Sequence, residues 1–89
     1  MELLIERSLL EDLGFERCRN TSGWDHEVWY HKIDFWVHFF EDSDSNSQKM
    51  YHHEANAFIT SRSEFLRKFL FEFENHIIDA SYIHYTRLF

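Results

Sequence analysis

The sequence has little of the material from which several common functional sites are built. It contains no proline, two glycines and one cysteine among 89 residues. With Gly14 and Gly23 alone, a glycine-rich phosphate loop cannot be built, and Cys18 alone excludes a disulfide within the chain. No apolar run reaches the roughly 18 residues that a membrane-spanning helix needs. Acids occur where a secretory signal is basic and apolar, so we expect a cytoplasmic protein.

Basic residues are scarce as well. Nine Lys and Arg residues oppose sixteen Asp and Glu residues, which gives a formal net charge of −7. A protein of this charge repels phosphate backbones, so direct binding of nucleic acid is not expected. The charge favours instead a partner protein that carries a basic surface. We expect no cofactor and no association with a membrane.

Aromatic residues are abundant, at 19% of the chain with ten Phe. A chain of 89 residues forms one domain, 1–89, around a single small core. Each large ring buries roughly 150 to 250 Å², so this is more aromatic material than such a core usually absorbs. We therefore expect some rings at the surface, where a contiguous patch indicates a binding partner.

The segment around which the sheet is predicted is 28–41, VWYHKIDFWVHFFE. Its aromatic and β-branched residues favour a pleated, half-buried surface, and from residue 33 the sequence alternates with the period of a strand. The odd positions are apolar and are predicted to lie under helices: Ile33, Phe35, Val37 and Phe39. The even positions form a mixed strip: Asp34, Trp36, His38 and Phe40.

An N-terminal helix is predicted to begin within the first few residues and to end at Leu13. Ile5, Leu9 and Leu13 recur at the i, i+4 and i+8 spacing of an apolar helix stripe. Gly14 suits the left-handed residue that follows a helix, and Phe15 can then close back onto the preceding turn in a Schellman-type stop.

The middle of the chain predicts antiparallel strands with short connections. The predicted strands cover 15–19, a segment from about residue 25, a segment from about residue 33, 49–53 and 57–60. A turn is predicted at 20–23 and a polar loop at 42–48. The reversal within 31–34 has no glycine or asparagine, so one long bent strand is the alternative there. Residues 57–60 alternatively lead into the next helix.

A second helix is predicted from a capping box formed by Ser61 and Glu64. Its apolar face is Leu66, Leu70, Phe73 and Ile77, flanked by Phe65 and Phe69. A second stripe lies about a third of a turn away: Phe71, Ile78, Tyr82, Tyr85 and Phe89. Three alternatives remain for the end of the chain: a break near Asp79, one long helix that presents the second stripe to a partner, or a short closing strand at 82–85.

Together these elements predict an α+β fold. It has an N-terminal helix, an antiparallel sheet of four to five strands in meander order and a C-terminal helix, with both helices on one sheet face. The layout and the Leu13-Gly14-Phe15 triplet resemble those of small phage and bacterial proteins, a likeness that includes no diagnostic motif.

The histidines are the main candidates for chemistry, because neutral imidazole is a common metal ligand. They are His26, His31, His38, His52, His53, His76 and His84. Their spacing matches no ligand motif, and a calcium loop that opens at Asp42 fails at its glycine and its final glutamate. We predict no catalytic residues and no metal ligands.

The leading hypothesis is therefore a non-enzymatic, acidic protein-binding module. The hypothesis predicts a phage-type inhibitor that masks the basic surface of a host nucleic-acid-handling or defence protein. The predicted partner-binding residues are Asp34, Trp36, His38, Phe40, Glu41, Asp42 and Asp44.

Two alternatives accompany this hypothesis. The first is a homodimeric antitoxin- or immunity-like subunit, with dimer contacts at Phe71, Ile78, Tyr82, Tyr85 and Phe89. The second is a small metalloenzyme that uses the region of His38, His52 and His53.

Overall fold

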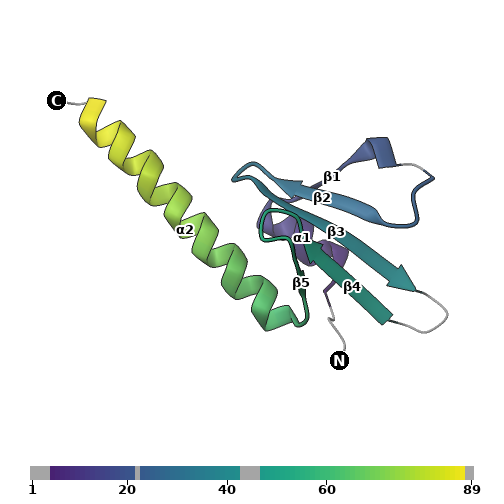
Figure 1. Cartoon of the computed structure of the whole chain (residues 1–89). Helices are drawn as coiled ribbons and strands as arrows, with labels where there is room; N and C mark the ends of the chain where they lie inside the picture. Colours follow the sequence, from purple (N-terminus) through teal and green to yellow (C-terminus); the bar gives the residue numbers. More distant parts are fainter. Residues whose placement is uncertain (1–4, 22, 43–46, 88–89) are drawn as a thin grey trace.

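Five strands pair in the order in which they occur in the chain, and two helices lie on one face of the resulting sheet (Figure 1). This computed structural model describes residues 5–21, 23–42 and 47–87, with the backbone alone for 21 and 77–87. The elements are α1 (Arg7–Leu13), β1 (Glu16–Arg17), a 3-10 helix (Arg19–Thr21), β2 (Glu27–His31), β3 (Phe35–Asp42), β4 (Ser47–His52), β5 (Ala57–Ile59) and α2 (Arg62–Arg87). Every neighbouring pair is antiparallel, which confirms the predicted α+β meander.

The start of α1 is set by a link to the sheet. The Ile5 N–H donates to Gln48 Oε1 at 2.9 Å, and Gln48 Nε2 donates to the Ile5 carbonyl at 3.0 Å. This pairing holds Ile5 outside the helix, which begins at Arg7, later than predicted. At the other end Gly14 has φ 99°, and the Phe15 N–H donates to the Leu10 carbonyl at 2.9 Å. The predicted left-handed stop is confirmed.

The reversal between β2 and β3 occurs at residues 32–34, as one of the two alternatives predicted. Asp34 adopts the left-handed conformation, with φ 62°, and its N–H donates to the His31 carbonyl at 3.1 Å. Aspartate tolerates this conformation better than most residues, so the turn forms without glycine. The alternative of one long bent strand is wrong. β1 is shorter than predicted, because the chain turns into the 3-10 helix after it.

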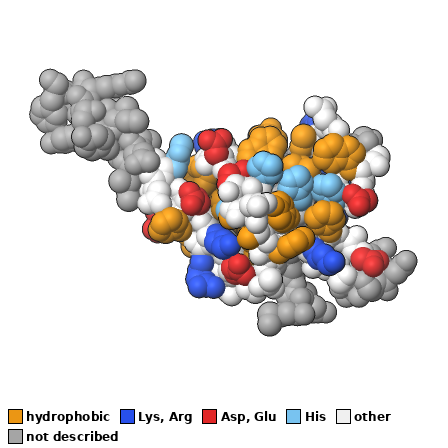
Figure 2. Space-filling view, in the orientation of Figure 1, with side chains coloured by type: hydrophobic (Ala, Val, Ile, Leu, Met, Phe, Trp, Pro, Cys, Tyr) orange, Lys and Arg blue, Asp and Glu red, His pale blue; other side chains and the backbone are white. Residues whose placement is uncertain are grey.

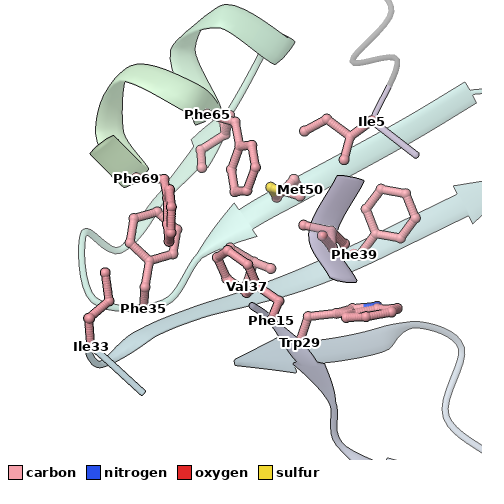
Figure 3. Close-up of a cluster of buried hydrophobic side chains, with 12 residues drawn as sticks. Ile5, Phe15, Trp29, Ile33, Phe35, Val37, Phe39, Met50, Phe65 and Phe69 are labelled. Carbon is pink, nitrogen blue, oxygen red and sulfur yellow. The ribbon is translucent and has the colours of Figure 1, made fainter. Parts of the chain in front are cut away.

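The hydrophobic core fills the space between the sheet and the helices (Figure 3). Phe35, Val37 and Phe39 are buried there, as the alternation predicted. The ring of Phe15 lies 5.8 Å from Phe65 and 5.2 Å from Phe69, which joins the end of α1 to α2. The other buried members of the core are Ile5, Leu10, Trp29, Ile33, Met50 and Ile59.

The N-terminus of α2 is capped by the predicted serine. The Glu64 N–H donates to Ser61 Oγ at 3.1 Å. The Glu64 carboxylate accepts from Thr60, at 3.1 Å from its N–H and 2.9 Å from its hydroxyl, so the reciprocal half of the box reaches one residue further back. The helix then continues without a break through Asp79, which selects the single long helix among the three alternatives.

The sheet-facing side of α2 is centred on its phenylalanines. Phe65 and Phe69 are buried, with Leu66 and Phe73 partly buried against them. Leu70 is 50% exposed, so its predicted place on the apolar face is wrong. The reason is the aromatic packing: Phe65 and Phe69 meet the Phe35 ring edge to face at 6.0 and 5.8 Å, which rotates Leu70 towards solvent.

Candidate functional site

The strand register places alternate side chains on the sheet face that points away from the helices, here called the open face. Tyr30 pairs with Trp36, His38 with Tyr51, and Tyr51 with Phe58. Figure 2 shows hydrophobic and histidine side chains lying side by side over the sheet. The open face consists of Glu16, Val28, Tyr30, Trp36, His38, Phe40, Asp42, Ser47, Lys49, Tyr51 and Phe58.

Ring contacts run across this face from β2 to β5. Tyr30 stacks on Trp36 with ring centroids 5.0 Å apart. His38 lies 5.9 Å from Tyr51, which lies 5.2 Å from the edge-on ring of Phe58. Such contacts fix the orientation of the rings, so the face offers a rigid aromatic surface. Trp36 and Phe58 remain exposed within it.

A hydrogen-bonded chain of Asp25, His26 and His38 crosses the open face. Asp25 Oδ1 lies 2.8 Å from His26 Nδ1, and His26 Nε2 lies 3.0 Å from His38 Nδ1. His26 also stacks on Phe40, with centroids 4.4 Å apart. Because the Asp25 carboxylate can only accept, His26 Nδ1 carries a proton. With both rings neutral, His26 Nε2 accepts from His38 Nδ1–H, and His38 Nε2 is left as an acceptor.

This chain also shifts the protonation of its members. Burial, followed by electrostatic interaction with the neighbouring His26 and His53, lowers the pKa of His38. The hydrogen bond with His26 lowers the pKa of the Asp25 carboxyl. At neutral pH the site therefore combines a carboxylate with a neutral His38 ring.

A groove of about 390 Å³ opens beside this chain. It is lined by the residue after β1, by β2 and the segment before it, by β3 and by the turn after β4. In that turn the His53 N–H donates to the Trp36 carbonyl at 2.9 Å, and the Trp36 N–H donates to Glu54 Oε1 at 2.6 Å. The lining residues are Cys18, Trp24, Val28, Trp36, His38, His53 and Glu54.

The structure brings together some of the predicted partner-binding residues and separates others. Trp36, His38 and Phe40 share the open face. Asp34 lies in the turn before β3. Asp42, the last residue of β3, lines a second, smaller groove together with Phe40 and Lys49. Asp44 lies outside the described residues.

Glu41 is held by side chains from the helix side of the sheet. Its carboxylate accepts from Arg7 Nη2 and from Gln48 Nε2, each at 3.1 Å. The hydrogen bonds from Gln48 and Arg7 hold the pKa of this carboxyl below its ordinary value. Arg7 also pairs with Glu27 at 2.7 Å, so the same guanidinium joins α1 to two strands.

Of the three residues proposed for metal binding, His38 and His53 lie together beside the groove, with ring centroids 5.7 Å apart, and His52 lies apart from them. His52 is 5% exposed and stacks on Phe35 under the helices, with centroids 4.0 Å apart, whereas His38 lies on the open face. His53, the first residue of the turn after β4, lies beside His38, so His52 cannot act together with these two rings. Within the described part of the chain, no group of three or more His, Cys, Asp or Glu side chains is arranged to hold a metal.

Of the residues proposed for dimer contacts, Phe71 is exposed on α2. The side chains of Ile78, Tyr82 and Tyr85, and all of Phe89, lie outside the described residues.

The predicted partner-binding residues do not include Asp25, His26 and Glu54, which belong to the site. Asp25 and His26 precede β2, which begins later than predicted, and Glu54 follows β4, so the period of the strands does not fix the positions of these side chains. The register between β2 and β3, which pairs Val28 with His38, is the signal that would have placed His26 beside His38.

No protein-family model, curated protein or solved structure matches this chain. Neither described helix has both the length and the apolar character needed to cross a bilayer.

Proposed function

We propose that the protein binds another protein through the open face. The observation that carries this proposal is the exposure of large aromatic side chains, Trp36 and Phe58 in the sheet and Trp24 beside it, on a face that neither helix covers. Aromatic side chains of fixed orientation are typical of the energetically dominant residues of protein interfaces. Burial of such an exposed aromatic patch against a partner is favourable in free energy.

The charges around the open face favour a partner with a basic surface. Four acidic side chains lie on or beside this face: Glu16, Asp25, Asp42 and Glu54. Among the described strand residues of the open face, the single Lys or Arg residue is Lys49. On the helix side, Arg7 pairs with two of the acids there. The formal net charge of −7 adds a long-range attraction towards a positively charged partner.

A host protein that handles nucleic acid, or that belongs to a defence system, meets this description because its phosphate-binding surface is basic. The protein acts on such a partner as an inhibitor: it covers the surface that phosphates otherwise occupy. Because the attraction is electrostatic at the rim, association weakens as the salt concentration rises.

Two phenylalanines provide a matched test of the binding face. Phe58 on the open face is 54% exposed, and Phe71 on α2 is 63% exposed. We expect Phe58→Ala to reduce the affinity for a captured partner by about tenfold, the effect of losing one well-placed interface ring. Phe71→Ala should leave that affinity unchanged, because its ring lies away from the open face. The measurement is affinity capture from host cells, followed by titration of the purified partner at two salt concentrations.

The opposite result would refute the proposal. If Phe71→Ala abolishes capture and Phe58→Ala does not, the partner binds α2. Circular dichroism of both variants verifies that each remains folded.

A homodimer through α2 is the second candidate. Leu70 and Phe71 are both exposed on this helix, and Figure 1 shows the C-terminal part of α2 extending beyond the sheet. Light scattering over a range of protein concentrations tests it. A dimer that Phe71→Ala converts to a monomer supports this candidate, and a monomer at the highest concentration excludes it.

A further inference from the structure

We propose that the groove between Trp24 and Trp36 receives an arginine side chain of the partner. This inference rests on the proposed function and deepens it, because it assigns the residue that the open face recognises. The groove offers two kinds of surface, exposed indole rings and hydrogen-bond acceptors, and arginine is the side chain that uses both.

The indole rings are held in place by their neighbours. Trp36 stacks on Tyr30 with an angle of 25° between the planes, and Trp24 lies 5.4 Å from the His26 ring. Both indoles remain exposed and line the groove. A guanidinium is planar and weakly hydrated, so it stacks on an indole face and is attracted by its π electrons. Because the rings are already oriented, little side-chain entropy is lost on binding.

The polar atoms of the groove favour a ligand that donates hydrogen bonds. The backbone N–H of Trp36 donates to Glu54 Oε1 and holds this carboxylate in place. The carboxylate oxygens can still accept further hydrogen bonds. His38 Nε2 is an acceptor because its Nδ1 donates to His26. Guanidinium carries N–H donors and no acceptor, so it complements both groups.

Other occupants fit this groove less well. A phosphate or carboxylate would be repelled by Glu54, and an apolar side chain would cover the Glu54 carboxylate without offering it a hydrogen bond. Lysine carries the charge, but its ammonium is a compact, strongly hydrated group that does not stack. The acidic balance of the chain is also complementary to a partner rich in arginine.

The three tryptophans make the proposal testable without the partner. The probe is N-acetylarginine amide, titrated into ¹⁵N-labelled protein while the indole N–H signals are followed by NMR. The signals of Trp24 and Trp36 are expected to shift and to saturate. Trp29 is an internal reference, because it is buried and its Nε1–H donates to Glu27 Oε1 at 2.9 Å.

Two controls separate recognition of arginine from weaker effects. N-acetylcitrulline amide has nearly the same shape without the charge, and we expect it to bind about tenfold more weakly or not at all. Glu54→Gln should weaken binding of the arginine probe by a similar factor, about tenfold. Asp42→Asn makes the same change of charge on the open face outside this groove, and should leave the affinity within about twofold of the wild type.

Several outcomes overturn the inference. Equal shifts with the arginine and citrulline probes indicate a neutral or apolar occupant. An unchanged affinity in Glu54→Gln removes the carboxylate from the site, and the absence of saturable shifts removes the site altogether. If the arginine probe fails while Phe58→Ala still loses the captured partner, the proposed function stands without this inference. If the probe binds and capture is insensitive to Phe58→Ala, the groove stands and the proposed function fails.

Discussion

Acidification from about pH 7.5 to about pH 5 is expected to destabilise the fold, because two histidines are buried on the helix-covered side of the sheet. His31 is 4% exposed, and His52 is 5% exposed. Burial lowers the pKa of both rings. For His31 the hydrogen bond to Leu13 opposes this effect, and for His52 the nearby Glu54 does so.

The local contacts explain why both rings stay neutral in the folded state. His31 Nε2 lies 3.1 Å from the Leu13 carbonyl oxygen, and the Ile33 N–H donates to His31 Nδ1 at 3.3 Å. Protonation at Nδ1 would displace that donor. Among the residues that the structure describes, neither ring nitrogen of His52 has a hydrogen-bond partner, although Nε2 lies 3.5 Å from Glu54 Oε1. A charged imidazolium there would lack the solvation that it has in the unfolded chain.

The sign and size of the effect follow from proton linkage. Each histidine has a lower pKa in the folded than in the unfolded state. Stability is therefore complete above the unfolded value of about 6.5 and falls as the pH drops towards the folded value. Within that interval each ring can lower the free energy of unfolding by up to about 1.4 kcal/mol per pH unit. Two rings together approach twice that slope, which is a loss of about 3 kcal/mol over one pH unit. This loss is a substantial part of the free energy of unfolding of a typical protein, about 5 to 15 kcal/mol.

Urea denaturation at a series of pH values measures this slope, with the fluorescence of buried Trp29 as a signal of unfolding. His52→Phe should remove the contribution of one ring and leave those of His31 and of His38, whose pKa is also lowered by burial. His53→Phe, at an exposed position next to it, should retain the contributions of both His31 and His52. A free energy of unfolding that stays constant over this pH interval would refute the reasoning.

Two further substitutions test the packing, each by the shift in the free energy of unfolding. Gly14→Ala should cost about 1 to 2 kcal/mol, because alanine is strained at φ +99° and its Cβ would lie 3.0 Å from His31 Nε2. An unchanged stability would show that the backbone of this turn relaxes without strain. Phe65→Ala should cost about 3 to 5 kcal/mol through loss of a buried ring, whereas Leu70→Ala should change stability by about 0.5 kcal/mol or less. Equal costs for these two α2 variants would contradict the assigned faces.

The elements themselves were largely predictable from local patterns. Gly14 and Phe15 marked the end of α1, and the alternation from Ile33 to Phe39 assigned the covered side of β3. Both patterns depend on interactions between residues close in the chain, and a single sequence records these directly. The capping of α2 at Ser61 belongs to the same class.

The candidate site was less predictable, because its geometry depends on turns that the sequence does not mark. Asp34 and Asn56 take positive φ values of 62° and 52° without glycine, and they close the turns that set the register around Trp36. The pairing of Glu41 with Arg7 spans 34 residues and was not predicted either. It places that carboxylate on the helix side of the sheet, away from the open face.

The core is completed late during synthesis of the chain, because Phe15 packs against Phe65 and Phe69 of the C-terminal helix. Each strand pairs with its neighbour in sequence, so the sheet can assemble while the ribosome is still elongating the polypeptide. The helix-covered side of that sheet remains exposed to solvent until Phe65 and Phe69 leave the ribosome, because these rings complete the core. A nascent chain that stalls before α2 would present Phe35, Val37 and Phe39 to chaperones and proteases, and completion of α2 ends that exposure.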